Sequence, residues 1–168
     1  HINPEAPSLD AGVLLDYLRA FLLLYDWLAK KSQLDLARQI SPYINRFPHE
    51  YSRLALPPDY RPDQKGLIRD YLRFNPTRNR PLDMLPLFSQ LDRELVMSHE
   101  VEKELISPRP AFHYRWPNSQ IDEPDWSFAA QWNLWVRVEE LAEDRDRLDE
   151  LARRFLARPG FPLDLFES

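Results

Sequence analysis

A long apolar stretch near the start of the chain constrains the fold most. The segment from residue 13 to residue 28 is apolar on nearly every side, within a strongly predicted helix over residues 9–31. Asp16, Arg19 and Asp26 interrupt it, so no uncharged run of about 18 residues is left to cross a membrane. We therefore expect a helix that is buried on several sides, against a sheet or another subunit.

The composition is that of a globular protein and excludes several functional classes. With 168 residues, 43% hydrophobic and 29% charged, residues 1–168 are expected to form a single domain, with a cytoplasmic location as the default. The net charge of −5 disfavours nucleic-acid binding through a basic surface. The absence of cysteine excludes disulfides, zinc–thiolate sites and cysteine nucleophiles. Three isolated glycines cannot build a P-loop or a Rossmann phosphate loop.

Helical spacing and capping residues predict further helices. Their ranges are 63–74, 82–88 (interrupted by Pro86), 99–106, 126–143 and 144–156. Ser8, Asp125 and Asp144 are the expected N-caps of the helices that follow them. Prolines break residues 33–62 into a meandering connection, and turn residues make 75–81 a loop.

The last two predicted helices differ in character. Trp132, Trp135, Val136 and Leu141 form a wide aromatic and aliphatic stripe, which is typical of a core face. The helix over 144–156 is dense in alternating charge and is expected to be a solvated outer face.

The segment 109–118 is predicted to contain a strand over residues 110–116. In a strand, residues two apart share a face, so Phe112 and Tyr114 would pack together while His113 and Arg115 point the other way. An imidazole beside a guanidinium suits a metal, a phosphate or a carboxylate. The alternative is an edge strand whose polar residues are simply solvated.

Two other polar clusters are candidate sites. His1, Asn3 and Glu5 would share one face of a short strand, or else belong to a frayed terminus. In the loop, Arg78 and Arg80 stand beside Asn75 and Asn79 between two prolines, an arrangement that suits phosphate or carboxylate or, alternatively, pairing with acidic helices. The remaining histidines, at positions 49 and 99, are interpreted as surface residues.

These segments together resemble the amidoligase family of the carboxylate–amine ligase superfamily, which includes glutamine synthetase. The resemblance covers most of the chain, and its motifs follow the same order: a His-x-polar strand, a long helix, an Asn/Arg loop, a strand ending in Arg, and a helix. The segments that carry it are residues 1–5, 18–28, 75–88, 109–118 and 132–139.

The resemblance implies an α+β, helix-rich fold with a few antiparallel strands, namely the C-terminal half of a glutamine-synthetase-like catalytic fold. The superfamily's first acidic metal-binding strand would lie upstream of His1, so the chain is expected to be the C-terminal segment of a larger ligase domain. The missing N-terminal half, or a second copy in a homo-oligomer, would then cover the apolar helix over 9–31.

The resemblance also implies ATP-dependent formation of an amide bond through an acyl phosphate, with Mg²⁺. Arg78, Arg80 and Arg115 would be catalytic and would hold phosphate or the substrate carboxylate. His113 stands where many superfamily members have a glutamate metal ligand, which is a departure from the pattern. The implied nucleotide-binding residues are His1, Asn3, Asn75 and Asn79, and the implied metal ligands are His1, Glu5 and His113.

The expected partners are a carboxylate and an amine, with a peptide as one option for the substrate, and neither nucleic acid nor membrane. Two other functions stay open. One is a catalytically silent helical module that binds a partner through the apolar helix. The other is a phosphate-binding regulatory domain that uses only the loop over residues 75–81, called the arginine loop. The ligase is favoured if His1, Arg78, Arg80, His113 and Arg115 line one cleft, and the interaction module is favoured if they scatter over the surface.

Overall fold

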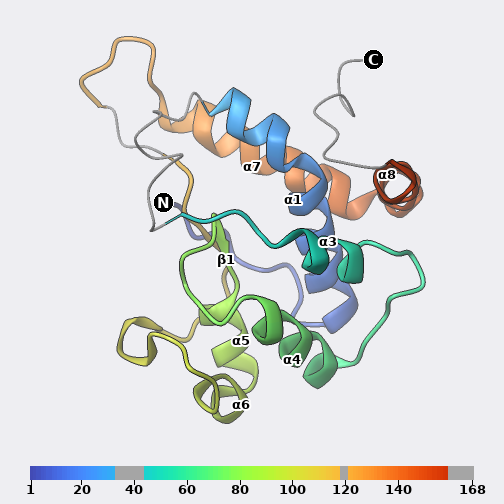
Figure 1. Cartoon of the computed structure of the whole chain (residues 1–168). Coiled ribbons are helices and arrows are strands. Elements are labelled where there is room, and N and C mark those ends of the chain that lie inside the picture. Colours follow the sequence, from blue (N-terminus) through green and yellow to red (C-terminus); the bar gives the residue numbers. More distant parts are fainter. Residues whose placement is uncertain (33–43, 118–120, 159–168) are drawn as a thin grey trace.

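The computed structural model describes residues 1–32, 44–117 and 121–158. It confirms the helix-rich α+β class (Figure 1). The first part of the predicted connection over 33–62 lies outside the described residues. The elements are α1 Ala11–Lys31, α3 His49–Ala55, α4 Gln64–Phe74, β1 Leu82–Asp83, α5 Leu85–Leu91, α6 Arg93–Met97, the 3₁₀ turn η1 Lys103–Leu105, β2 His113–Tyr114, α7 Phe128–Glu143 and α8 Arg145–Ala157.

Helix α1 begins at Ala11, two residues later than the predicted start at residue 9. Asp10 caps it, because its carboxylate accepts the backbone N–H groups of Gly12 and Val13. A charged carboxylate satisfies these groups and also interacts favourably with the helix dipole. Ser8, the predicted cap, instead accepts the N–H of Asp10 in the preceding turn.

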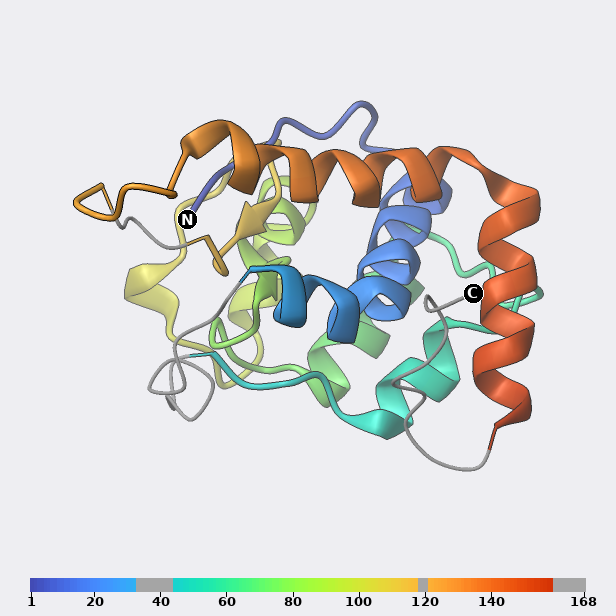
Figure 2. The same ribbon diagram turned by 90° about the horizontal axis from the view of Figure 1, so that it is seen from above.

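The chain itself buries α1, so the expectation that another polypeptide has to cover this helix is wrong. Helices α7, α8, α3 and α4 pack around it, as the two views of the ribbon also show (Figures 1 and 2). Leu14, Leu18, Phe21 and Leu28 are fully buried. Among the described residues, none of the helices has the length and apolar character needed to cross a membrane.

Two charged residues of α1 are buried in an ionic network. Arg19 is fully buried and donates to Asp16 at 3.3 Å and to Asp149 of α8 at 2.8 Å. Arg61 and Arg145 also reach Asp16, at 2.8 and 2.7 Å. Each buried charge therefore has partners, as burial requires. Two of the charges that interrupt the apolar run, Asp16 and Arg19, thus tie α1 to α8.

The middle of the chain corrects two predictions. Residues 82–83 form a strand, and Pro86 lies in the first turn of α5, where its missing N–H costs nothing. The helix predicted over 99–106 is wrong: α6 starts earlier, capped by Asp92, and ends at Met97. The N–H and the hydroxyl of its C-cap Ser98 both bond to the carbonyl of Leu95. Only the short turn η1 follows.

The two C-terminal helices meet at Asp144, where the chain turns sharply (Figure 2). Ser127, and not Asp125, caps α7. Trp135 is fully buried, but Trp132 is 36% exposed, so only part of the predicted stripe is core. Helix α8 is capped by Asp144 as predicted, but it is not only an outer face, since Leu148, Leu151, Ala152 and Phe155 are buried.

The strands form a small antiparallel sheet with β2 in the centre. On one side Leu82 pairs with Tyr114 and Asp83 with His113. On the other side the first residues of the chain form bridges, from Ile2 to Tyr114 and from Glu5 to Ala111. Segments from the start, middle and later part of the sequence thus lie side by side.

Candidate functional site

Strand β2 presents two chemically different faces, as its alternation predicts. Phe112, Tyr114 and Trp116 are buried against α1 and α7. The ring of Phe112 stacks on Tyr17 at 5.0 Å, and that of Tyr114 lies 5.3 Å from Trp135. These contacts fix the strand and turn the intervening residues to the opposite side of the sheet.

We call that opposite side of the sheet the polar face. Because partners across a sheet share a face, it comprises residues from all three paired segments. They are His1, Asn3, Glu5, Asp83, His113 and Arg115. The face begins as predicted, with His1, Asn3 and Glu5 exposed while the intervening Ile2 and Pro4 are buried.

His113 and Asp83 form a buried pair at the centre of the polar face. Nδ1 of His113 lies 3.1 Å from one carboxylate oxygen of Asp83, and the two residues are only 5% and 2% exposed. The interpretation of a strand with solvated polar residues is therefore wrong for His113. The other oxygen of Asp83 accepts the N–H of Leu85 at the start of α5.

This pairing determines what the imidazole can do. An ionised carboxylate can only accept, so Nδ1 of His113 is the donor and Nε2 is the nitrogen that can accept a proton or bind an electrophile. A carboxylate behind a histidine also fixes the orientation of its ring. Sequence reasoning missed Asp83, because only the register with β2 places it opposite His113.

His1 lies next to this pair. Its ring meets that of His113 edge to face, with 4.8 Å between the centroids. The oxygen of Asn3 accepts two N–H groups of Arg109, at 3.1 and 2.8 Å, so Asn3 is held by the loop before β2. In the described parts of the chain no three His, Asp or Glu side chains are grouped as a metal site. The implied ligands His1, Glu5 and His113 are thus not assembled into one.

The arginine loop divides into two parts, and the first part is internal. Asn75 is fully buried, and Arg80 is 8% exposed. Nε of Arg80 donates to Asn75 at 2.8 Å, and its guanidinium lies over the ring of Phe47. Burial lowers the pKa of Arg80. Through these contacts Asn75 and Arg80 stabilise the loop from inside. The catalytic role implied for Arg80 and the nucleotide-binding role implied for Asn75 stay predictions.

The second part of the loop lies beside the polar face. Nη1 of Arg115 donates to the carbonyl of Arg78, and the N–H of Arg115 bonds to Pro81. Glu102 accepts the N–H of Arg78 at 3.0 Å and the hydroxyl of Thr77 at 2.9 Å. Partial burial works against the charge of Glu102, but these hydrogen bonds and the charge of Arg78 prevail and lower its pKa.

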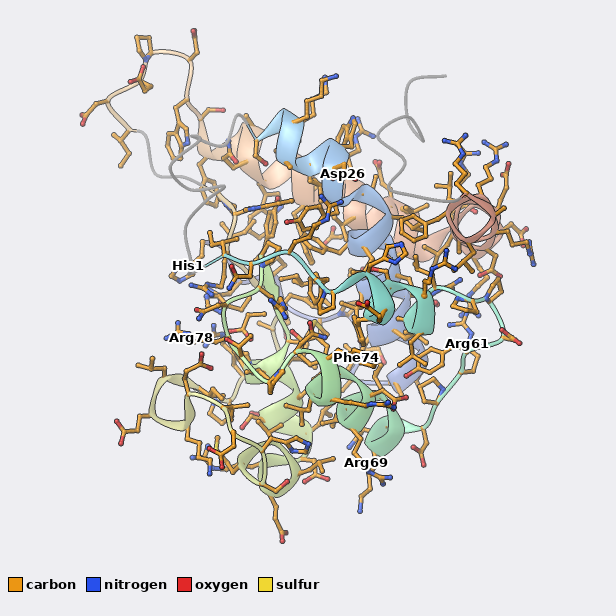
Figure 3. The ribbon with its side chains drawn as sticks, viewed as in Figure 1. His1, Asp26, Arg61, Arg69, Phe74 and Arg78 are labelled. Atoms are coloured by element: carbon orange, nitrogen blue, oxygen red, sulfur yellow. The ribbon has the colours of Figure 1, made fainter. Side chains whose placement is uncertain are left out.

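Four of the five residues expected to line one cleft are neighbours along the polar face and the adjoining loop. His1 touches His113, and Arg115 holds the backbone of Arg78. Figure 3 shows His1 and Arg78 on one side of the molecule, with Arg61 of the ionic network on the other. Arg80 does not join them, since it supports the loop from within.

Comparison with known proteins decides the family. Residues 1–137, more than three quarters of the chain, match the family model described as "Putative amidoligase enzyme". The chain belongs to the amidoligase family. The match contains the whole polar face and the arginine loop of this amidoligase and ends within α7, before α8. No curated protein and no solved structure matches the chain.

Proposed function

We propose that this amidoligase is an ATP-dependent carboxylate–amine ligase that works through an acyl phosphate. The observation that carries the proposal is that His1, His113 and Arg115 share the polar face of the sheet and that Arg115 binds the backbone carbonyl of Arg78 in the adjoining loop. Family membership supports the general amidoligase role.

The proposed reaction has two steps. A carboxylate oxygen of the acid attacks the γ-phosphorus of ATP, and the bond to ADP breaks. The amine then attacks the acyl carbon, inorganic phosphate leaves, and the amine loses a proton. Phosphoryl transfer needs cationic groups that stabilise charge on the transferring oxygens, a role that suits Arg78 and Arg115. Nε2 of His113 is the candidate acceptor of the amine proton.

The described donors do not by themselves make a magnesium site. Mg²⁺ prefers oxygen ligands in octahedral geometry, whereas this face offers two imidazoles and, besides the engaged Asp83, the carboxylate of Glu5. No step is therefore assigned to a metal ion. Mg²⁺ bound with ATP remains part of the proposal, because nucleotide phosphates commonly bring it.

The first test is nucleotide binding, measured by calorimetry with MgATP. Arg78→Ala removes one charge-assisted contact, so affinity is expected to fall about 10- to 150-fold, equivalent to about 1.5–3 kcal/mol. Arg93, exposed on α6, gives a matched control: Arg93→Ala should bind like the wild type. Equal affinity of all three proteins would remove Arg78 from the site.

The second test addresses the acyl phosphate. With ATP, an amine and an ¹⁸O-labelled carboxylic acid that support turnover, one labelled oxygen should appear in inorganic phosphate. ATP binding without any ADP formation across a broad panel of acids and amines would instead favour a phosphate-binding regulatory domain. Absence of ATP binding would favour a catalytically silent interaction module.

A further inference from the structure

A polar pocket lies between the end of α1 and the start of α7. Its volume is about 350 Å³. The side chains that matter for its chemistry are Lys31, Ser32, Glu123, Asp125, Trp126 and Gln131. Pockets of this size accommodate small ligands. None of these residues belongs to the polar face or to the arginine loop.

Among the described residues, two buried polar atoms of the lining have no hydrogen-bond partner. They are Nε1 of Trp126 and Oε1 of Gln131. The hydroxyl of Ser32, a residue only 6% exposed, lies within hydrogen-bonding reach of Tyr114. Buried polar groups are nearly always hydrogen-bonded, and leaving one unpaired costs about 1–3 kcal/mol. The two unpaired atoms therefore point to a polar occupant.

Their chemistry defines what the occupant has to bring. The indole N–H of Trp126 can only donate and Oε1 of Gln131 can only accept, so the occupant needs both an acceptor and a donor. The lining also carries charges of both signs: Lys31 is positive, and Glu123 and Asp125 are negative. A simple anion would be repelled by two carboxylates, and a simple cation would leave Lys31 and the indole without an acceptor.

The start of α7 adds to this pattern. Ser127 caps the helix, so Asp125 is not used as a cap and its side chain is left to line the pocket. The positive end of the 16-residue helix favours an anionic group nearby. Ser127 and Ala130, in the first turn, also line the pocket.

We propose that this pocket binds a free α-amino acid. Its carboxylate is received by Lys31, Ser32 and the indole N–H of Trp126. Its ammonium is received by Glu123, Asp125 and Oε1 of Gln131. The site is independent of the ligase reaction proposed above, and its occupancy is measured without ATP.

The test uses indole ¹H–¹⁵N NMR signals of the full chain, with the Trp126 signal assigned from Trp126→Phe. The twenty common amino acids are screened first, and L-serine is then compared with 3-hydroxypropanoate, which lacks the ammonium, and with ethanolamine, which lacks the carboxylate. The proposal expects at least one amino acid to shift the Trp126 signal saturably. For L-serine, or for the analogous trio built on the best amino acid, both truncated compounds should bind at least tenfold more weakly.

Variants within one loop provide the matched comparison. Asp125→Asn should weaken amino-acid binding about tenfold or more, the usual effect of losing a hydrogen bond to a charged group. Asp122→Asn, a neighbouring exposed position outside the lining, should leave binding unchanged. Thermal unfolding of both variants checks that they are folded.

Four results would overturn the proposal. Shifts with none of the twenty amino acids would mean that water alone fills the pocket. Equal binding of the deaminated compound would make it an anion site, and equal binding of the decarboxylated compound would make it an amine site. Equal loss of binding in Asp125→Asn and Asp122→Asn would place the ligand elsewhere.

Discussion

Asp83 and His113 face each other across the sheet, with 3.1 Å between a carboxylate oxygen and Nδ1 of the ring. Asp83 also holds the N–H of Leu85, so one side chain fixes both the imidazole and the start of α5. The pair thus connects the geometry of the candidate site to the stability of the fold.

Asp83→Ala is expected to lower the free energy of unfolding by about 1–3 kcal/mol for each buried group left unpaired. Two groups lose their acceptor, the ring nitrogen of His113 and the N–H of Leu85. Urea denaturation measures the loss. Asp59→Ala, at an exposed turn position, is the control and should change stability by less than about 0.5 kcal/mol. A loss as small as that of the control would contradict the importance of the pair.

Arg19→Ala tests the buried ionic network. Removing this cation takes the buried partner from Asp16 and Asp149, which keep only the partly exposed Arg61 and, for Asp16, Arg145. It also removes the donor to the carbonyl of Leu56. Breaking a buried pair typically costs about 3–5 kcal/mol. Arg147→Ala breaks only a surface pair with Glu150, where the expected loss is about 0–1 kcal/mol. Chemical denaturation of both variants should therefore give clearly separated midpoints.

Two tryptophans of α7 make a matched pair for core packing. Trp135 is fully buried among Tyr17, Phe112 and Tyr114, and Trp135→Ala should cost about 3–5 kcal/mol. Trp132 contacts Phe128 on the exposed side, so Trp132→Ala should cost less than about 1 kcal/mol. Thermal unfolding distinguishes them, and similar melting temperatures would show that the helix packs through another face.

Glu102 should make the stability of the arginine loop depend on pH. Its pKa is lower in the folded than in the unfolded protein, so its contribution is present above the unfolded value and is lost as the pH falls through the folded value. Wild type should exceed Glu102→Gln in stability at pH 7, and the difference should shrink by pH 3. Denaturation at both values measures this change. The exposed Glu104→Gln should show no such trend.

Local patterns in the sequence were enough to predict several parts of the fold. The apolar run gave α1, the spacing of Leu67, Ile68 and Tyr71 gave α4, and strict alternation gave the two faces of β2. Caps were less predictable, because several Ser and Asp residues compete near each helix start and only the local geometry decides. Asp10 and Ser127 prevailed over Ser8 and Asp125 for this reason.

The candidate site was predicted in part, and the missing part depends on contacts between distant segments. Polar residue types at 1, 78, 113 and 115 are visible in the sequence, but nothing local distinguishes Arg78 at the polar face from Arg80 inside the loop. Asp83 and the unpartnered atoms of Trp126 and Gln131 acquire their meaning only from neighbours far away in the chain.

The ionic network around Arg19 also restricts how this protein can evolve. Arg19 is bound to Asp16 one turn before it and to Asp149 some 130 positions later, beyond the region that matches the family. Loss of any one member removes a partner from a buried or partly buried charge, so single substitutions should be selected against. In homologues that share α8, positions 16, 19 and 149 should therefore change together, with an apolar trio as the simplest replacement for the charged one.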